Sequence, residues 1–87
     1  MPEKHWKIDV FIDEHEDRTR ARAKLDADDT GVTGIGTARL HPVDTNVPEI
    51  GDELAVSRAL ADLAHRLLEA AANDIEAVTH QPVHLSR

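Results

Sequence analysis

Two histidines near the end of the chain have a spacing that can bind a metal. His80 and His84 are four residues apart, the separation at which a helix presents two imidazoles to zinc. Pro82 lies between them and breaks a helix at that point, and no third ligand of a zinc-protease pattern accompanies the pair. We therefore assign no metal site and expect the histidines to be solvated.

A cluster of carboxylates raises the question of acid–base chemistry. It consists of Asp13, Glu14, Glu16 and Asp17, directly before Arg18. General acid–base catalysis needs a pocket that moves two pKa values apart, whereas these residues fall in a short charged turn beside arginines. A solvated turn explains the cluster better.

The remaining groups to consider for catalysis are a glycine-rich string, one serine and cysteine, which the chain lacks. The string from Gly31 to Gly36 has glycines of the phosphate-binding type, but neither the helix nor the lysine of a P-loop follows it. Ser57 lacks the sequence context of a nucleophilic serine. The chain has no cysteine, which excludes disulfides, thiolate zinc sites and cysteine nucleophiles. We expect a protein that is not an enzyme and that has no cofactor.

Basic residues gather on alternate positions, on what we predict to be the open face of a sheet. The candidate binding residues are Arg18, Arg20, Arg22, Lys24, Arg39 and Phe11. A surface that contacts phosphates, with one aromatic side chain in it, is one interpretation. The alternatives are a solvated face whose charge is balanced by Asp9 and Asp13, and a subunit interface around Phe11 and Ile35.

Two alternating segments position most of these residues. Residues 6–13 and 18–25 each alternate apolar or small side chains with charged ones, and this period of two predicts a half-buried strand in both cases. We expect a hairpin closed by residues 14–17, with every apolar pair on one face. Its register pairs Asp13 with Arg18, Phe11 with Arg20, Asp9 with Arg22 and Trp6 with Leu25.

A third strand over residues 32–40 completes the predicted sheet, with Leu25 opposite Val32. Its buried face then contains a shallow trough of small residues: Ala21, Ala23, Gly34, Gly36 and Ala38. Glycine inside a strand marks a place where another backbone comes close. The approaching element should be a helix.

That helix is predicted over about residues 49–80, after a start signal at Pro48 and Glu49. Its apolar residues form two neighbouring stripes: Val56, Leu60, Leu63 and Leu67, then Ala64, Leu68, Ala71 and Ile75. Asn73 and Asp74 either begin a short second helix or lie within the first, and Pro82 ends it in both cases. Because the stripes are wider than the sheet requires, part of the helix should contact a second copy.

Composition limits the class of protein. A chain of 87 residues fits one α+β domain, and with aromatic residues at 2% its core must be thin, so we expect a homodimer. The net charge of −7 argues against sequence-independent nucleic-acid binding by the whole surface. The chain starts without a signal peptide and has no apolar run of the roughly 18 residues that a membrane span needs. We therefore expect a cytoplasmic protein.

Several strings, spread from His5 to Pro82, resemble a family of short actinobacterial proteins of unknown function. They are His5-Trp6, Ile12-Asp13-Glu14-His15-Glu16, Gly34-Ile35-Gly36-Thr37-Ala38-Arg39-Leu40, Asn46-Val47-Pro48-Glu49-Ile50-Gly51-Asp52-Glu53-Leu54 and Asp74-Ile75-Glu76-Ala77-Val78-Thr79-His80-Gln81-Pro82. One branch of that family belongs to the dormancy and hypoxia response of mycobacteria. The resemblance implies a strand-strand-strand-helix unit related to double-stranded-RNA-binding (dsRBD-like) folds, in a dimer likened to ribosome hibernation factors. It implies no catalytic residues.

Two functions remain open on these grounds. The first is a non-enzymatic, stress-associated binding protein that acts on ribosomes or RNA through the basic face. The second is a protein-interaction or structural homodimer with no nucleic-acid role.

Overall fold

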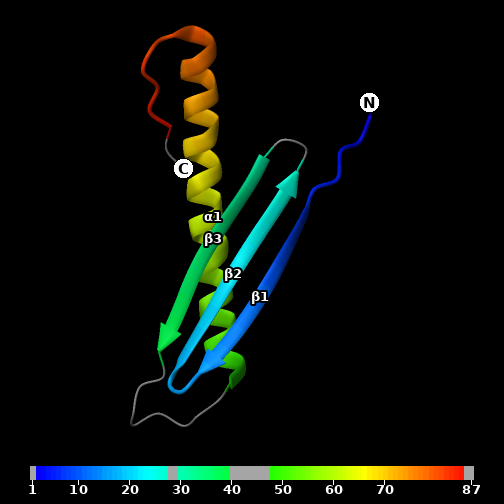
Figure 1. Cartoon of the computed structure of the whole chain (residues 1–87), viewed down its shortest axis with the longest axis vertical. Coiled ribbons are helices and arrows are strands. Elements are labelled where there is room, and N and C mark those ends of the chain that lie inside the picture. The colour runs from blue at the N-terminus through cyan, green and yellow to red at the C-terminus, as the bar shows by residue number, and fades with distance from the viewer. Residues whose placement is uncertain (1, 28–29, 40–47, 86–87) are drawn as a thin grey trace.

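Three strands and one helix make up the described part of the chain, in the order β1 (Lys7–His15), β2 (Arg18–Ala27), β3 (Thr30–Arg39) and α1 (Pro48–Thr79). The structure, a computed structural model, describes residues 2–27, 30–39 and 48–85. The strands form one antiparallel sheet in the order β1-β2-β3, and α1 lies across one face of it (Figure 1). This confirms the predicted α+β meander with one long helix. Of the two alternatives for the end of the helix, the short second helix is excluded, because α1 runs unbroken through Asn73 and Asp74.

The register of the β1–β2 hairpin differs from the prediction by two residues. His15 pairs with Arg18 and Phe11 with Arg22, because the turn holds only Glu16 and Asp17 rather than residues 14–17. Glu16 adopts a left-handed backbone conformation with φ of 57°, which allows so short a turn. A slip of two residues leaves each side chain on the same face, so the predicted faces are correct although the pairs are wrong.

The β2–β3 pairing agrees with the prediction, with Leu25 opposite Val32. The predicted trough also exists, and the helix backbone lies in it. A methyl group added to Gly34 would overlap backbone atoms of Ala59 and Leu63, and one added to Gly36 would overlap those of Ala55 and Ala59. The glycines of β3 therefore let α1 approach the sheet at backbone distance.

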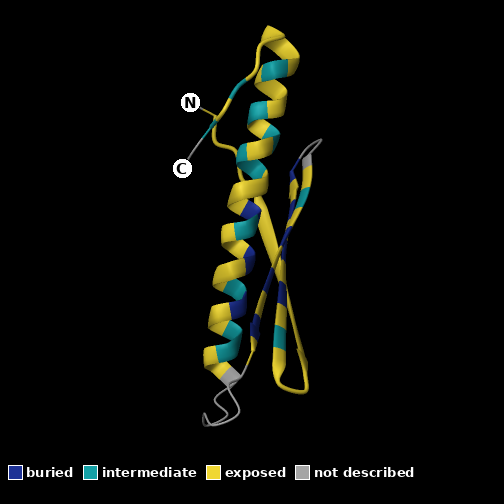
Figure 2. Ribbon diagram, turned by 90° about the vertical axis from the view of Figure 1, so that its left-hand side faces the viewer, coloured by how far each residue is buried: buried dark blue, intermediate teal, exposed yellow. Residues whose placement is uncertain are grey.

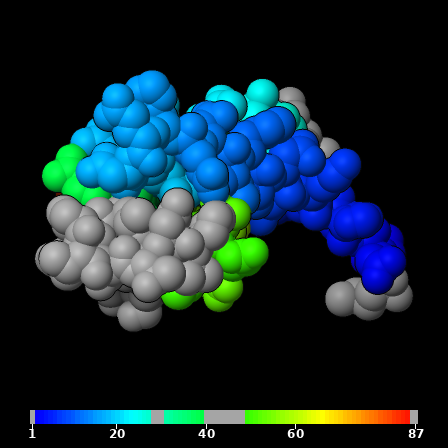
Figure 3. Space-filling view, turned by 90° about the horizontal axis from the view of Figure 1, so that it is seen from below, coloured from blue at the N-terminus to red at the C-terminus, as the bar shows by residue number. Residues whose placement is uncertain are grey.

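Burial is confined to the part of the sheet that α1 covers, namely β2 and β3. Seen from the hairpin end, β1 and β2 form one layer and the start of α1 belongs to the other (Figure 3). The buried hydrophobic residues are Ala21, Ala23, Leu25, Ala27, Ala38, Ala55, Ala59 and Leu63. Only two residues in this described core are larger than alanine, so the expectation of a thin core is correct.

The first strand was expected to be half-buried, and this is wrong. Every residue of β1 is exposed, on the helix side as well as on the open side (Figure 2). The physical reason is the position of α1: its backbone is seated against the glycines of β3, so the helix reaches β2 and β3 and leaves β1 uncovered.

The end of α1 folds back on itself. Thr79 is the last helical residue, and His80 has φ of 60°, with its amide donating to the Glu76 carbonyl at 2.7 Å. The amide of Val83 then donates to a Glu76 carboxylate oxygen at 3.2 Å, which directs the following tail along the helix (Figure 1). The helix thus stops before Pro82, as expected. No helix in the described ranges is long and apolar enough to cross a membrane.

Candidate functional site on the open sheet face

The predicted binding residues lie together on the sheet face opposite α1. This open face consists of Lys7, Asp9, Phe11, Asp13, His15, Arg18, Arg20, Arg22, Lys24, Asp26, Gly31, Thr33, Ile35, Thr37 and Arg39. Alternation along three paired strands puts them there, since side chains two residues apart share a face. Six of them are lysine or arginine. The prediction missed Asp26, because it ended the second strand at residue 25, whereas the alternation continues to residue 27.

A cross-strand row at the middle of this face combines an aromatic, a cation and an aliphatic side chain. Phe11, Arg22 and Ile35 are direct neighbours across the three strands. The Arg22 guanidinium carbon lies 5.1 Å from the centroid of the Phe11 ring, within the range of a cation–π interaction. The structure therefore joins Phe11 to Arg22, where the predicted register had joined it to Arg20. The Arg22 guanidinium thus lies over the ring and offers a planar cation to a base or another planar group.

The charges on the open face are only partly balanced. Lys7 pairs with Asp9 at 3.7 Å, and Lys24 pairs with Asp26 at 3.8 Å, both between exposed side chains. Within the described residues, no carboxylate lies in ion-pair range of the four arginines Arg18, Arg20, Arg22 and Arg39. Asp13, which was expected to help balance the face, is opposite Arg20 in the register but forms no ion pair there. The arginines are thus available to phosphate or carboxylate groups of a partner.

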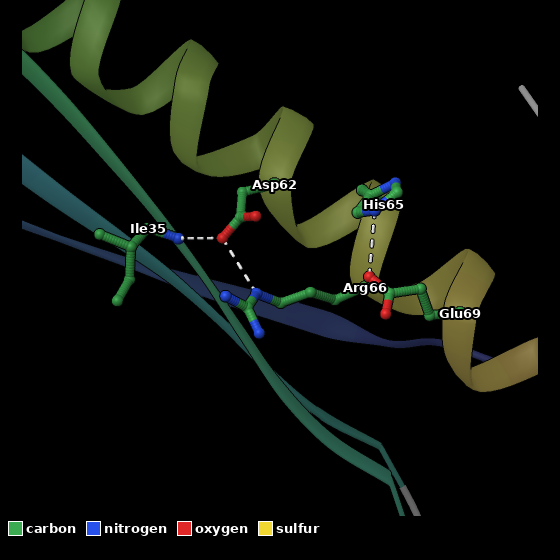
Figure 4. Close-up of polar contacts among 5 residues, drawn as sticks. All are labelled: Ile35, Asp62, His65, Arg66 and Glu69. Atoms are coloured by element: carbon green, nitrogen blue, oxygen red, sulfur yellow. Dashed lines mark hydrogen bonds and ion pairs between the residues drawn. The ribbon is translucent and has the colours of Figure 1, made fainter.

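A second polar cluster joins the outer edge of β3 to α1 (Figure 4). The Ile35 amide donates to Asp62 Oδ2 at 2.9 Å, and the same oxygen accepts from Arg66 Nε at 3.0 Å. Nearby, Arg58 Nη1 donates to the Thr37 carbonyl at 2.7 Å. The Ile35 amide, followed by Arg66, holds the pKa of the Asp62 carboxyl below its ordinary value. Arg58, Asp62 and Arg66 lie outside the two predicted apolar stripes of the helix, and the sequence gave no signal for these strand contacts.

The histidines and acids that were set aside do not converge on a metal site. Within residues 2–27, 30–39 and 48–85, no group of three or more His, Asp or Glu side chains is arranged to hold an ion. His84 does line a cavity of about 230 Å³ between the tail and α1, together with His65, Glu69 and Glu76. His65 Nε2 lies 3.1 Å from Glu69 Oε1. Ser57 Oγ donates to the Leu54 carbonyl of its own helix at 3.0 Å, a local contact that gives the hydroxyl no base.

Comparison with known proteins gives relatives over nearly the whole chain. The chain is 58% identical over 81 residues to the uncharacterized protein Mb1767 of Mycobacterium bovis, covering 93% of this chain and 86% of the relative. It is 54% identical over 80 residues to the uncharacterized protein Rv2632c of Mycobacterium tuberculosis, covering 92% and 86%. The crystal structure of Rv2632c matches with a TM-score of 0.85 at 51% identity, over 94% of this chain and 98% of that one.

These matches confirm the expected relation to short mycobacterial, hence actinobacterial, proteins. A model of one family, described as Rv2632c-like, covers residues 4–84. Because that range takes in all three strands and the whole helix, the chain belongs to the Rv2632c-like family.

Proposed function

We propose that this protein is a non-enzymatic, cytoplasmic binding protein of the stress or dormancy response, which acts as a homodimer and binds RNA, such as that of the ribosome, through its open face. The observation that carries the proposal is the set of four open-face arginines that form no ion pair among the described residues, one of which, Arg22, lies over the ring of Phe11. Guanidinium groups bind phosphates in a bidentate manner, and an exposed aromatic ring accepts a stacked base.

The family resemblance supports the same proposal from another side. The resemblance identified in the sequence links one branch to hypoxia and dormancy and likens the dimer to ribosome hibernation factors. The β-β-β-α order of the described elements is compatible with the strand and helix order of a dsRBD-like fold. That likeness concerns shape, so the chemistry of the open face has to carry the functional argument.

The charge distribution shapes the affinity that we expect. The chain as a whole carries −7, so RNA is repelled by most of the surface and attracted only by the open face. Binding should therefore be weak at high ionic strength and fall steeply with added salt, because each phosphate contact releases a counterion.

The test replaces two arginines of the face and compares them with two basic residues elsewhere. Arg20→Gln with Arg22→Gln should abolish co-sedimentation with mycobacterial ribosomes and weaken binding of single-stranded RNA. If both residues contact phosphates, the slope of log affinity against log salt should become shallower by about 1.4. This double variant and its control should both remain folded, since exposed substitutions usually cost less than about 0.5 kcal/mol in unfolding free energy.

Lys4→Gln with Arg66→Gln is the matched control, because it removes the same charge from residues that are not part of the open face, one before β1 and one on α1. The proposal is wrong if both double variants lose ribosome association equally, or if the wild type binds neither ribosomes nor RNA at low salt.

The second candidate is a homodimer that binds proteins or serves structure and has no nucleic-acid role. The acidic net charge and the uncovered hydrophobic residues of β1 favour it. In that case the wild type does not bind RNA, and the Arg20→Gln/Arg22→Gln variant does not differ from it in this respect. If the open face is the subunit contact, the same variant shifts the dimer toward monomer and lowers its melting temperature as the protein is diluted.

A further inference from the structure

Most positive charges of the open face form one column along β2, the central strand of the sheet (Figure 1). The members of this cation column are exposed and occupy alternate positions of the strand: Arg18, Arg20, Arg22 and Lys24. Because an antiparallel strand rises about 3.4 Å per residue, neighbouring members are about 6.8 Å apart and the column is about 20 Å long. Successive phosphates along an extended single strand of nucleic acid are separated by about the same distance as two neighbours in the column.

The cation column holds like charges in positions where they repel one another. Arg18 is directly opposite Arg39 across β2 and β3, and like charges in directly opposite positions destabilise a sheet. Among the described side chains, no carboxylate is in ion-pair range of either arginine. Bound anions would remove this repulsion. The column therefore has both the charge and the spacing of a site for a linear polyanion.

The two strands beside the cation column differ in charge. On the β1 side, Asp13 is directly opposite Arg20, and Asp9 is directly opposite Lys24. The residues of β3 opposite the column are Thr33, Ile35, Thr37 and Arg39. None of these four is acidic. Because the carboxylates of β1 repel phosphates, a phosphate backbone that follows the column is favoured on its β3 side.

The bases of such a strand would then lie over β1, which offers contacts to them. The Arg22 guanidinium carbon lies over the Phe11 ring, 5.1 Å from its centroid, and the planar cation can stack with a base. Asp13 forms no ion pair among the described residues. Its carboxylate can accept a hydrogen bond from an exocyclic amino group, as acidic side chains do from cytosine N4. Uracil has no such amino group, so β1 should distinguish the two pyrimidines.

We infer that the RNA bound by the open face is an extended single strand, which lies along β2 with its phosphates over the cation column and its bases toward β1. This inference rests on the proposed function and specifies its substrate class. A duplex presents two phosphate backbones, whereas β1, only about 4.8 Å from β2, has Asp9 and Asp13 where a second row of cations would be needed. The four cations match about four nucleotides, a short site for a single strand.

The first experiment uses the unmodified full chain. Fluorescence anisotropy at low ionic strength compares single-stranded RNA of about 2 to 12 nucleotides with the longest of these in duplex form. Affinity should rise steeply up to about four nucleotides and slowly beyond, and the longest single strand should bind about tenfold more tightly than the duplex. A duplex that binds as tightly as the single strand would overturn the inference and leave the proposed function standing.

The second experiment shortens the cation column. Arg18→Gln should weaken binding of single-stranded RNA and make the slope of log affinity against log salt shallower by about 0.7, the value for one phosphate contact of a single strand. Lys4→Gln is the control, because it removes an exposed charge that lies before β1, and it should change neither quantity. Circular dichroism checks that both variants are folded. Equal losses in the two variants would overturn the inference, because general attraction and not the column would then hold the RNA.

The third experiment tests the orientation of the strand. At neutral pH, oligo(C) should bind about fivefold more tightly than oligo(U), the effect of one net hydrogen bond, and Asp13→Ala should remove this preference. If phosphates lie over β1 instead, Asp13→Ala should raise the affinity for both oligonucleotides equally, because it removes a repelling charge. That result would overturn the assigned orientation. A wild type that binds no RNA of any length at low salt would overturn the inference and the proposed function together.

Discussion

Val10 and Ala23 are partners across β1 and β2, yet the larger hydrophobic residue is 38% exposed and the smaller one is fully buried. The same contrast separates the two parts of the sheet. On β2 and β3, small residues are buried under α1, whereas on β1 isoleucine and valine on the same face are left in solvent. Burial in this protein is thus decided by where the helix lies and not by which residues are most hydrophobic.

The position of the helix follows from the small residues. Gly34 and Gly36 allow backbone contact with α1, and Ala55 and Ala59 of the helix allow it from the other side. Close backbone packing excludes water efficiently but buries few methylene groups, so each contact contributes little hydrophobic free energy. The packed part therefore relies on shape, while larger hydrophobic residues, such as Val10 on β1 and Leu54 on α1, stay exposed.

The largest effect should come from filling the close contact. Gly36→Val places side-chain atoms where the backbone of Ala55 and Ala59 lies, so α1 must move off the sheet. We expect a loss of more than about 3 kcal/mol, beyond the usual cost of overpacking, and loss of the cooperative unfolding transition in urea. Gly31→Ala is the control, because its new methyl group would meet only Asp26 Oδ1 at 3.7 Å and should be nearly neutral. A cooperative, stable Gly36→Val protein would show that the backbone contact does not position the helix.

A smaller effect should separate two leucines three residues apart on α1. Leu63 is 2% exposed in the packed part, and Leu63→Ala should cost about 2 to 4 kcal/mol in urea unfolding because it leaves a cavity. Leu60 is 41% exposed, and at high dilution Leu60→Ala should cost less than about 1 kcal/mol. Its cost should grow with protein concentration if this part of α1 is covered in the proposed homodimer. Equal costs for the two variants at high dilution would remove the distinction between packed and uncovered surfaces.

The smallest effect concerns the polar contacts at the β3 edge. The pKa of Asp62 is lowered in the folded state, mainly by the Ile35 amide and then by Arg66, so its charged form stabilises the fold. That contribution is complete above the unfolded pKa of about 3.9 and is lost as the pH falls through the lower, folded pKa.

Asp62→Asn should therefore be slightly less stable than the wild type near neutral pH, and the difference in unfolding free energy should shrink as the solution is acidified below the ordinary range of an aspartate. Chemical denaturation over a pH series measures it. A difference that stays constant down to strongly acidic pH would mean that the Asp62 charge does not contribute.

The sequence alone determined the elements, their faces and the trough. Period-two alternation predicted all three strands, and the glycines of the third strand predicted the close approach of a helix, because both signals are local consequences of side-chain size and direction. The same alternation assembled the basic face correctly although the hairpin register was wrong by two residues, since a two-residue slip does not change faces.

What only the tertiary structure decided is which part of an apolar face is covered. Residues 6–13 have the pattern of a half-buried strand, but a single helix is narrower than three strands and must lie over one side of the sheet. Gly34 and Gly36 let the helix pack on the β3 side of the sheet. Two hydrogen bonds hold it there, one from the Ile35 amide to Asp62 and one from Arg58 to the Thr37 carbonyl. These are contacts between residues 19 or more positions apart, and no local pattern encodes them. The exposed β1 face is therefore a consequence of packing geometry.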